Sequence, residues 1–148
     1  MERVLPSGIE DKAAPWRLEP GTPAVEAAVG LVEALQYMRG IGLDEIERHV
    51  RELAAYARAQ LADLPGIRIV SAPGSAITSF VATSPSHLLA RGLSDRFGVC
   101  VRSGFHCAQP LHDALGLSPT IRLSFGVYNR PVDVDRCVVG LKKLLSVI

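Results

Sequence analysis

The segment from Leu43 to Leu64 constrains the fold of this chain more than any other. Apolar residues recur in it at every third or fourth position: Leu43, Ile46, Val50, Leu53, Ala57, Leu61 and Leu64. This spacing places them along one face of an α-helix. Pro65-Gly66 follows and ends the helix. Because a helix with one apolar stripe must bury that stripe against another element, the chain needs a second layer.

The remaining segments alternate between helical and strand-like patterns. We expect further helices over 22–39, 84–97, 108–115 and 131–147, and strands over 67–71, 76–83, 99–102 and 120–128. Prolines and glycines predict an extended, irregular leader over 1–21, although Trp16 indicates that this leader packs on something. The order of elements predicts an α+β fold, a small, mostly antiparallel sheet covered by helices. The expected domains are the leader, 1–21, and a folded domain, 22–148.

Composition excludes several classes of function. The chain has 148 residues, 48% hydrophobic and 21% charged, as expected for one globular domain. Its net charge of +1, with both signs interspersed, indicates no nucleic-acid partner. Charges interrupt every apolar run, so we expect no membrane span and no signal peptide. An odd set of three cysteines without paired spacing predicts a reducing compartment, and hence a cytoplasmic location.

The segment Val101–Leu111, VRSGFHCAQPL, carries the main candidate for chemistry. Cys107 follows a glycine turn and stands directly after His106. A thiol acts as a nucleophile in its thiolate form, which nearby positive charge favours. Arg102 and His106 are the candidates for that charge. Arg102 can also simply pair with a carboxylate, and neighbours in sequence need not touch in space.

Arg122 is the second candidate, because strand alternation places it on the face opposite Ile121 and Leu123. A guanidinium there can hold a carboxylate through two parallel hydrogen bonds, although a solvated strand arginine fits the pattern too. Gly21 and Thr22 precede an expected helix start, where Thr22 serves either as an ordinary N-cap or as part of an anion seat. We expect no metal site, because the spacing of Cys100, His106, Cys107 and His112 is not that of zinc ligands and the sulfur of Cys100 is expected to face the core.

Three segments together resemble the C-terminal part of group II cysteine desulfurases, the class that includes selenocysteine lyases. Residues 14–23, APWRLEPGTP, resemble the P-W-R-F-E-A-G-T-P-N segment of that class. Residues 101–111 resemble its V-R-x-G-H-H-C-A-x-P-L loop, and residues 122–129 its R-A-S…Y-N-T stretch. These enzymes depend on pyridoxal phosphate and have the class V aminotransferase fold, so the resemblance implies the small C-terminal domain of a fold-type I enzyme.

The resemblance also implies roles for single residues. Cys107 would attack the sulfur of a cysteine–cofactor adduct and keep it as a persulfide, releasing alanine. Arg122 would hold the α-carboxylate of the substrate, and Arg102 would shape the loop, with His106 in support. Gly21 and Thr22 would contact the cofactor phosphate in the active site of the other subunit. Sulfur transfer, for instance toward iron–sulfur cluster assembly, would follow.

Departures from the family pattern limit these expectations. Phe105 replaces the first histidine of the loop, and Lys12, Lys142 and Lys143 match no cofactor-lysine motif. Because such an enzyme needs a lysine Schiff base, we expect the chain alone not to bind pyridoxal phosphate and to be inactive. The expected partners are a complementary large-domain chain or further copies in a homo-oligomer, and a sulfur-acceptor protein. Two alternatives stay open: a stand-alone persulfide carrier and a folded vestigial fragment.

Overall fold

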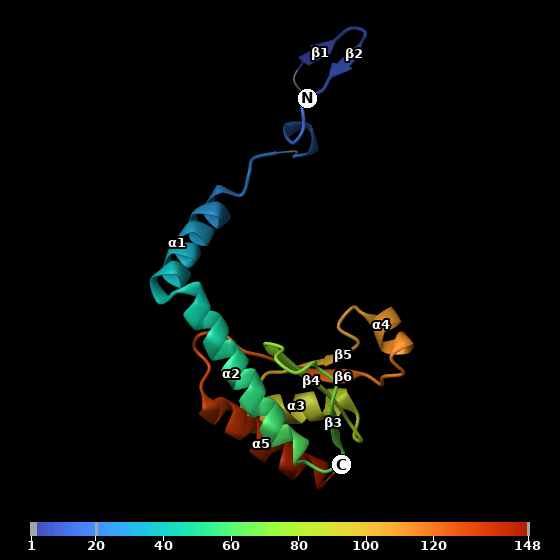
Figure 1. Ribbon diagram of the computed structural model, residues 1–148. Coiled ribbons are helices and arrows are strands. Elements are labelled where there is room, and N and C mark those ends of the chain that lie inside the picture. The colour runs from blue at the N-terminus through green and yellow to red at the C-terminus, as the bar shows by residue number, and fades with distance from the viewer. Residues whose placement is uncertain (1–2, 20, 148) are drawn as a thin grey trace. The chain divides into compact units, whose positions relative to one another are not determined.

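The computed structural model describes residues 3–19 and 21–147 (Figure 1). The chain divides into two compact units, residues 1–40 and residues 41–148. Each unit is described by itself below. The candidate residues Cys107 and Arg122 belong to the second unit, and Gly21 and Thr22 to the first.

The first unit begins with a small hairpin. Strands β1 (Arg3–Leu5) and β2 (Gly8–Glu10) pair antiparallel, with Arg3 opposite Glu10. The prediction of an irregular leader is therefore wrong for this segment, because Pro6 and Ser7 form the turn of the hairpin and leave the strands free to pair. A 3-10 turn, η1 (Trp16–Leu18), follows.

Helix α1 (Val25–Ile41) completes this unit. It begins after Pro23, so Thr22 lies ahead of the N-cap position and the expected N-cap role of Thr22 is wrong. None of its described residues is buried, and many of its large apolar side chains are exposed: Val25, Val29, Leu31, Val32, Leu35, Tyr37 and Met38.

The second unit contains a four-stranded antiparallel sheet. Its strands are β3 (Ile67–Ile69), β4 (Ile77–Ala82), β5 (Arg102–Gly104) and β6 (Thr120–Ser124), in the order β3-β4-β6-β5. The helices are α2 (Leu43–Ala62), α3 (Ser86–Phe97), α4 (Gln109–Ala114) and α5 (Pro131–Leu145). Helices α2 and α3 pack against the sheet, and α5 packs against both of them (Figure 1). The predicted α+β class is confirmed.

The core lies between the sheet and these three helices. Helix α2 buries Leu53, Ala57 and Leu61 of its apolar stripe, whereas Leu43 at its start is exposed. Fully buried partners come from the sheet and the other helices: Phe80, Leu89, Leu93, Ile121 and Leu141. The hydroxyl of Thr78, also fully buried, donates to the carbonyl of Ala54 at 2.9 Å and so ties α2 to β4.

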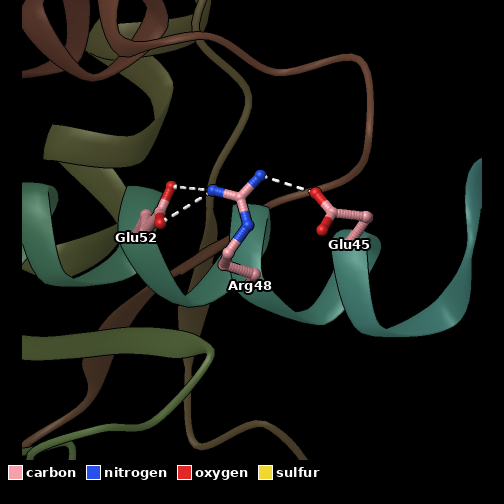
Figure 2. A network of polar contacts seen from close by, with 3 residues as sticks. All are labelled: Glu45, Arg48 and Glu52. Carbon is pink, nitrogen blue, oxygen red and sulfur yellow. Dashed lines mark hydrogen bonds and ion pairs between the residues drawn. The ribbon is translucent and has the colours of Figure 1, made fainter.

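Salt bridges mark the exposed face of α2. Arg48 reaches both Glu45, one turn before it, at 2.6 Å and Glu52, one turn after it, at 2.9 Å (Figure 2). Hydrogen bonding to Arg48 holds the pKa of Glu45 below its ordinary value. Exposed pairs of this kind contribute little to stability, so the core decides the fold.

Strand β5 begins later in the chain than the sequence predicts. Gly98 takes the left-handed conformation, with φ of 62°, and closes α3 by donating its N–H to the carbonyl of Ser94 at 3.2 Å. The N–H of Val99 still donates to the carbonyl of Leu93 at 3.1 Å, and the strand begins only at Arg102. The prediction that Cys100 faces the core is therefore wrong, because Cys100 precedes the strand and is exposed.

Candidate functional site

The candidate site is built on the last two strands of the sheet. In their antiparallel register Arg102 of β5 lies opposite Arg122 of β6, and Gly104 lies opposite Thr120. Ile121 and Leu123 are buried on the helix-covered face, so Arg122 belongs to the other face, as strand alternation predicts. Two like charges at directly opposed positions destabilise a sheet. Such a pair therefore favours an anion placed nearby.

Cys107 lies within reach of one of these arginines. Its side chain is exposed, and Nη2 of Arg102 lies 3.6 Å from its Sγ. Arg102 thus connects two candidates: it contacts the sulfur of Cys107 and pairs in register with Arg122.

The loop that carries Cys107 has an unusual backbone. His106 and Cys107 have φ angles of 54° and 59°, and Gly104 has φ of 111°. Left-handed residues other than glycine cost on the order of 1–3 kcal/mol each and concentrate at functional sites. The two side chains enter different surroundings, since that of His106 is half-buried and that of Cys107 exposed.

Two buried nitrogen atoms beside this loop lack partners. Nε of Arg122 and Nδ1 of His106 make no hydrogen bond within the described part of the chain. Both residues line a pocket of about 230 Å³, together with Ser79, Leu111, His112, Leu115 and Thr120. Because a buried guanidinium N–H without an acceptor is costly, a ligand oxygen in the pocket would stabilise it. A carboxylate is the acceptor that best matches a guanidinium.

His106 contributes an uncharged imidazole. Burial lowers its pKa, and the positive charges of Arg122 and Arg102 lower it further. The ring therefore stays neutral at pH 7, which leaves Arg102 as the cation beside Cys107. Nε2 of His106 lies 2.8 Å from the hydroxyl of Thr120. Sequence reasoning missed Thr120, although its spacing of two residues from Arg122 in β6 places both on one face.

The other candidates are placed elsewhere. Gly21 and Thr22 lie in the first unit ahead of α1, where both are exposed and Gly21 has φ of 88°. Cys100 lines a separate pocket of about 440 Å³, together with Tyr128, Asn129, Arg130 and Arg136. Cys137 is buried in the core, and burial raises the pKa of its thiol to about 12.

The described residues were also compared with the requirements of a metal site and of a membrane-spanning helix. No group of three or more His, Cys, Asp or Glu among them is arranged to hold a metal ion. Within the same residues, every helix is too short or too polar to cross a membrane.

Comparison with known proteins identifies the family. The model of the class-V aminotransferase family matches residues 1–137. The chain belongs to the class-V aminotransferase family. A probable cysteine desulfurase of Halalkalibacterium halodurans is 41% identical over 134 residues, which are 89% of this chain and 33% of that protein. Probable cysteine desulfurase 2 of Mycobacterium leprae is 41% identical over 138 residues, 90% of this chain and 33% of that protein.

Solved structures of cysteine desulfurases are similar to this chain in fold. The cysteine desulfurase CsdA of Escherichia coli, in an S-sulfonic acid form, matches with a TM-score of 0.89 and 34% identity, over 99% of this chain and 37% of that one. A cysteine desulfurase of Thermococcus onnurineus NA1, in its apo form, matches with a TM-score of 0.86 and 32% identity, over 99% of this chain and 38% of that one. The chain therefore spans about a third of the length of the relatives that it matches.

Cysteine desulfurases depend on pyridoxal phosphate, which a lysine side chain holds covalently. A covalent seat needs a lysine that faces the substrate site. No lysine lines the described pocket at Arg122. Lys142 lines a different pocket, with Leu64 and Thr83, and Lys143 lies over the ring of Phe97. The described residues that line the pocket at Arg122 therefore offer no amine for a covalent link to the cofactor.

Proposed function

We propose that this chain supplies the sulfur-accepting cysteine and the carboxylate-binding arginine of a cysteine desulfurase. The observation that carries the proposal is the position of Arg102, which contacts the sulfur of Cys107 and lies opposite Arg122 in the sheet. The sulfur of Cys107 and the guanidinium of Arg122 are thereby neighbours of the same side chain, which supports a shared site. A cysteine-derived substrate presents the matching groups, a carboxylate and a sulfur.

Each residue has a defined role in this function. Arg122 binds the substrate carboxylate and so satisfies its buried Nε. Arg102 stabilises the thiolate of Cys107, which attacks a sulfur atom and forms a new S–S bond. When the donor is a persulfide, R–S–SH, the donor S–S bond breaks and the thiolate R–S⁻ leaves. Cys107 then carries the transferred sulfur and its hydrogen as a persulfide.

The remaining parts of the reaction require more than the described residues. Pyridoxal phosphate and its lysine would come with the part of the relatives that this chain does not span, in a complementary large-domain chain. Gly21 and Thr22 would contact the cofactor phosphate of a neighbouring active site. In this function residues 1–21 would act as a leader and residues 22–148 as the folded domain. We place the protein in the cytoplasm, where its three cysteines stay reduced, and assign it a sulfur-acceptor protein as its next partner.

A persulfide-transfer assay tests the central step. The 148-residue chain is incubated with a small-molecule persulfide donor, and the added sulfur is located by mass spectrometry of the peptides. We expect the sulfur on Cys107 and its loss in Cys107→Ser. Cys100→Ser is the matched control, because Cys100 is also exposed but lines a pocket near Tyr128 and Asn129, away from the loop of Cys107 in the sequence. Equal loading of Cys100 and Cys107 would refute a special role for the loop.

A second assay separates the desulfurase from a stand-alone persulfide carrier, which the exposure of Cys107 also permits. The chain is mixed with pyridoxal phosphate and with a large-domain polypeptide from a cysteine desulfurase, and alanine release from cysteine is measured. We expect release only from the mixture, and a raised KM for cysteine in Arg122→Gln. Sulfur loading of Cys107 without alanine release from the mixture would favour the carrier.

A further inference from the structure

Two histidines and a threonine beside the site form a continuous chain of hydrogen bonds. Nδ1 of His112 lies 3.0 Å from the carbonyl oxygen of Ala108, and its Nε2 lies 3.3 Å from the hydroxyl of Thr120. The same hydroxyl lies 2.8 Å from Nε2 of His106. His112 and Thr120 are buried, with 5% and 3% of their surface exposed, so water does not replace these contacts readily. Neither residue has a role in the proposed function.

The directions of these bonds follow from what each atom can do. A carbonyl oxygen only accepts, so Nδ1 of His112 carries the proton and donates to Ala108. In the neutral ring Nε2 of His112 is then an acceptor, and the hydroxyl of Thr120 must donate to it. A hydroxyl has one hydrogen, so toward His106 the oxygen of Thr120 only accepts. Nε2 of His106 therefore carries a proton, and its Nδ1 keeps a free lone pair.

We propose that His112 and Thr120 are positioning residues that fix His106 in its Nε2–H tautomer. The consequence lies at the other nitrogen. Nδ1 of His106 is buried and has no partner within the described residues, and His106 lines the same pocket as Arg122. This lone pair can therefore accept a hydrogen bond from a molecule whose carboxylate binds Arg122. The donor would be the ammonium or thiol group of that molecule. A ring free to choose its tautomer would present that acceptor only part of the time.

This inference deepens the proposed function, but its test does not depend on activity. Long-range ¹H–¹⁵N NMR of the histidine rings reports which nitrogen carries the proton. In the 148-residue chain at neutral pH we expect His106 as a single Nε2–H tautomer and His112 as the Nδ1–H tautomer. Thr120→Val keeps the shape of the side chain but removes the hydroxyl. We expect it to turn the single tautomer of His106 into a mixture.

Thr78→Val is the matched control. It removes another buried hydroxyl, which donates to the carbonyl of Ala54 and makes no hydrogen bond to His106 or His112 among the described residues. We expect it to lower stability as Thr120→Val does but to leave the tautomer of His106 unchanged. A fall in the rate of sulfur loading on Cys107 in Thr120→Val and not in Thr78→Val would link the tautomer to the chemistry.

The outcomes separate the two proposals. An Nδ1–H tautomer of His106 in the unmodified chain, or a tautomer unaffected by Thr120→Val, would overturn the positioning role whatever Cys107 does. The expected tautomers with no sulfur on Cys107 would overturn the proposed function and leave the positioning role standing. If Thr120→Val does not fold, His112→Gln provides the same tautomer measurement, because its side chain cannot reproduce both ring contacts.

Discussion

Replacing Arg102 by glutamine should make the protein more stable and Cys107 less reactive. Arg102 lies directly opposite Arg122 in the antiparallel pair of β5 and β6. Like charges at such positions destabilise a sheet, and glutamine removes one charge while it keeps a side chain of similar length. The same substitution removes the guanidinium that lies 3.6 Å from the sulfur of Cys107. One change therefore separates stability from function.

The expected magnitudes follow from the exposure of the groups. A directly opposed like-charge pair costs roughly 0.2–1 kcal/mol, so Arg102→Gln should raise the free energy of unfolding by about 0.5 kcal/mol. For a chain of this size that corresponds to a rise in Tm of about 1–2 °C. The contact of Arg102 with Cys107 is exposed, and exposed contacts of a charged side chain contribute at most about 1 kcal/mol. The rate of alkylation of Cys107 at pH 7 should therefore fall by at most about fivefold.

Three measurements check this prediction. Urea unfolding at low salt and at about 1 M salt tests the electrostatic origin, since a Debye length of about 3 Å at 1 M should remove most of the gain. Alkylation followed by peptide mass spectrometry gives the rate at Cys107. An NMR titration should show a higher pKa for His106, because the charge of Arg102 is one of the causes that lower it, after burial and Arg122.

Arg68→Gln is the matched control. Arg68 is exposed on β3, the other edge strand, but lies opposite the apolar Val81. We expect Arg68→Gln to change the free energy of unfolding by no more than a few tenths of a kcal/mol. The reactivity of Cys107 should stay the same. An Arg102→Gln variant that is destabilised at every salt concentration, or whose Cys107 reacts at an unchanged rate, would refute the reasoning.

Three further predictions concern packing, pH and the thiols. Gly140→Ala should destabilise the protein by about 1–3 kcal/mol in urea unfolding, because an added Cβ would lie 2.7 Å from Cδ2 of Leu93; exposed Val139→Ala is its control on α5. The pKa of His106 lies below its ordinary value of 6.5 because of burial first and the charges of Arg122 and Arg102 next. The unfolded chain then binds the proton more readily, so His106 should contribute a loss of stability as pH falls from about 6.5 toward the folded pKa, and His106→Gln should remove that slope. Cys137, with its pKa raised to about 12 by burial, should resist alkylation at pH 8 in the native protein and react in urea, whereas the exposed Cys100 and Cys107 react in both.

Local patterns predicted the elements of the fold well where burial decides them. The stripe of α2 predicted which side of that helix packs on the sheet, and Leu53 and Leu61 are buried there. Alternation along β6 likewise predicted that Arg122 lies on the face opposite Ile121. These predictions succeeded because helix and strand periods sort side chains between a core and a surface whatever the neighbouring elements are.

Other features depend on contacts that no local pattern encodes. Cys100 was expected in a strand, but the left-handed glycine at Gly98 delays pairing until Arg102. The prolines and glycines of residues 1–21 predict an irregular chain and so hide the hairpin near the N-terminus, in which Pro6 lies at the turn. His112 had no predicted role, because its contact with Thr120 joins residues of a short helix and a strand that come together only in the folded sheet.

The left-handed backbone of His106 and Cys107 sends these two successive side chains into different environments. The imidazole enters a sheltered hydrogen-bonded interior beside Thr120, while the very next side chain emerges into solvent. Substitutions at residues 112 and 120 would therefore change the hydrogen bonds around His106 and leave the side chain of Cys107 exposed to solvent. Conversely, substitutions around Cys107 would change the exposed surface near its thiol and leave the hydrogen bonds between His106, Thr120 and His112 in place.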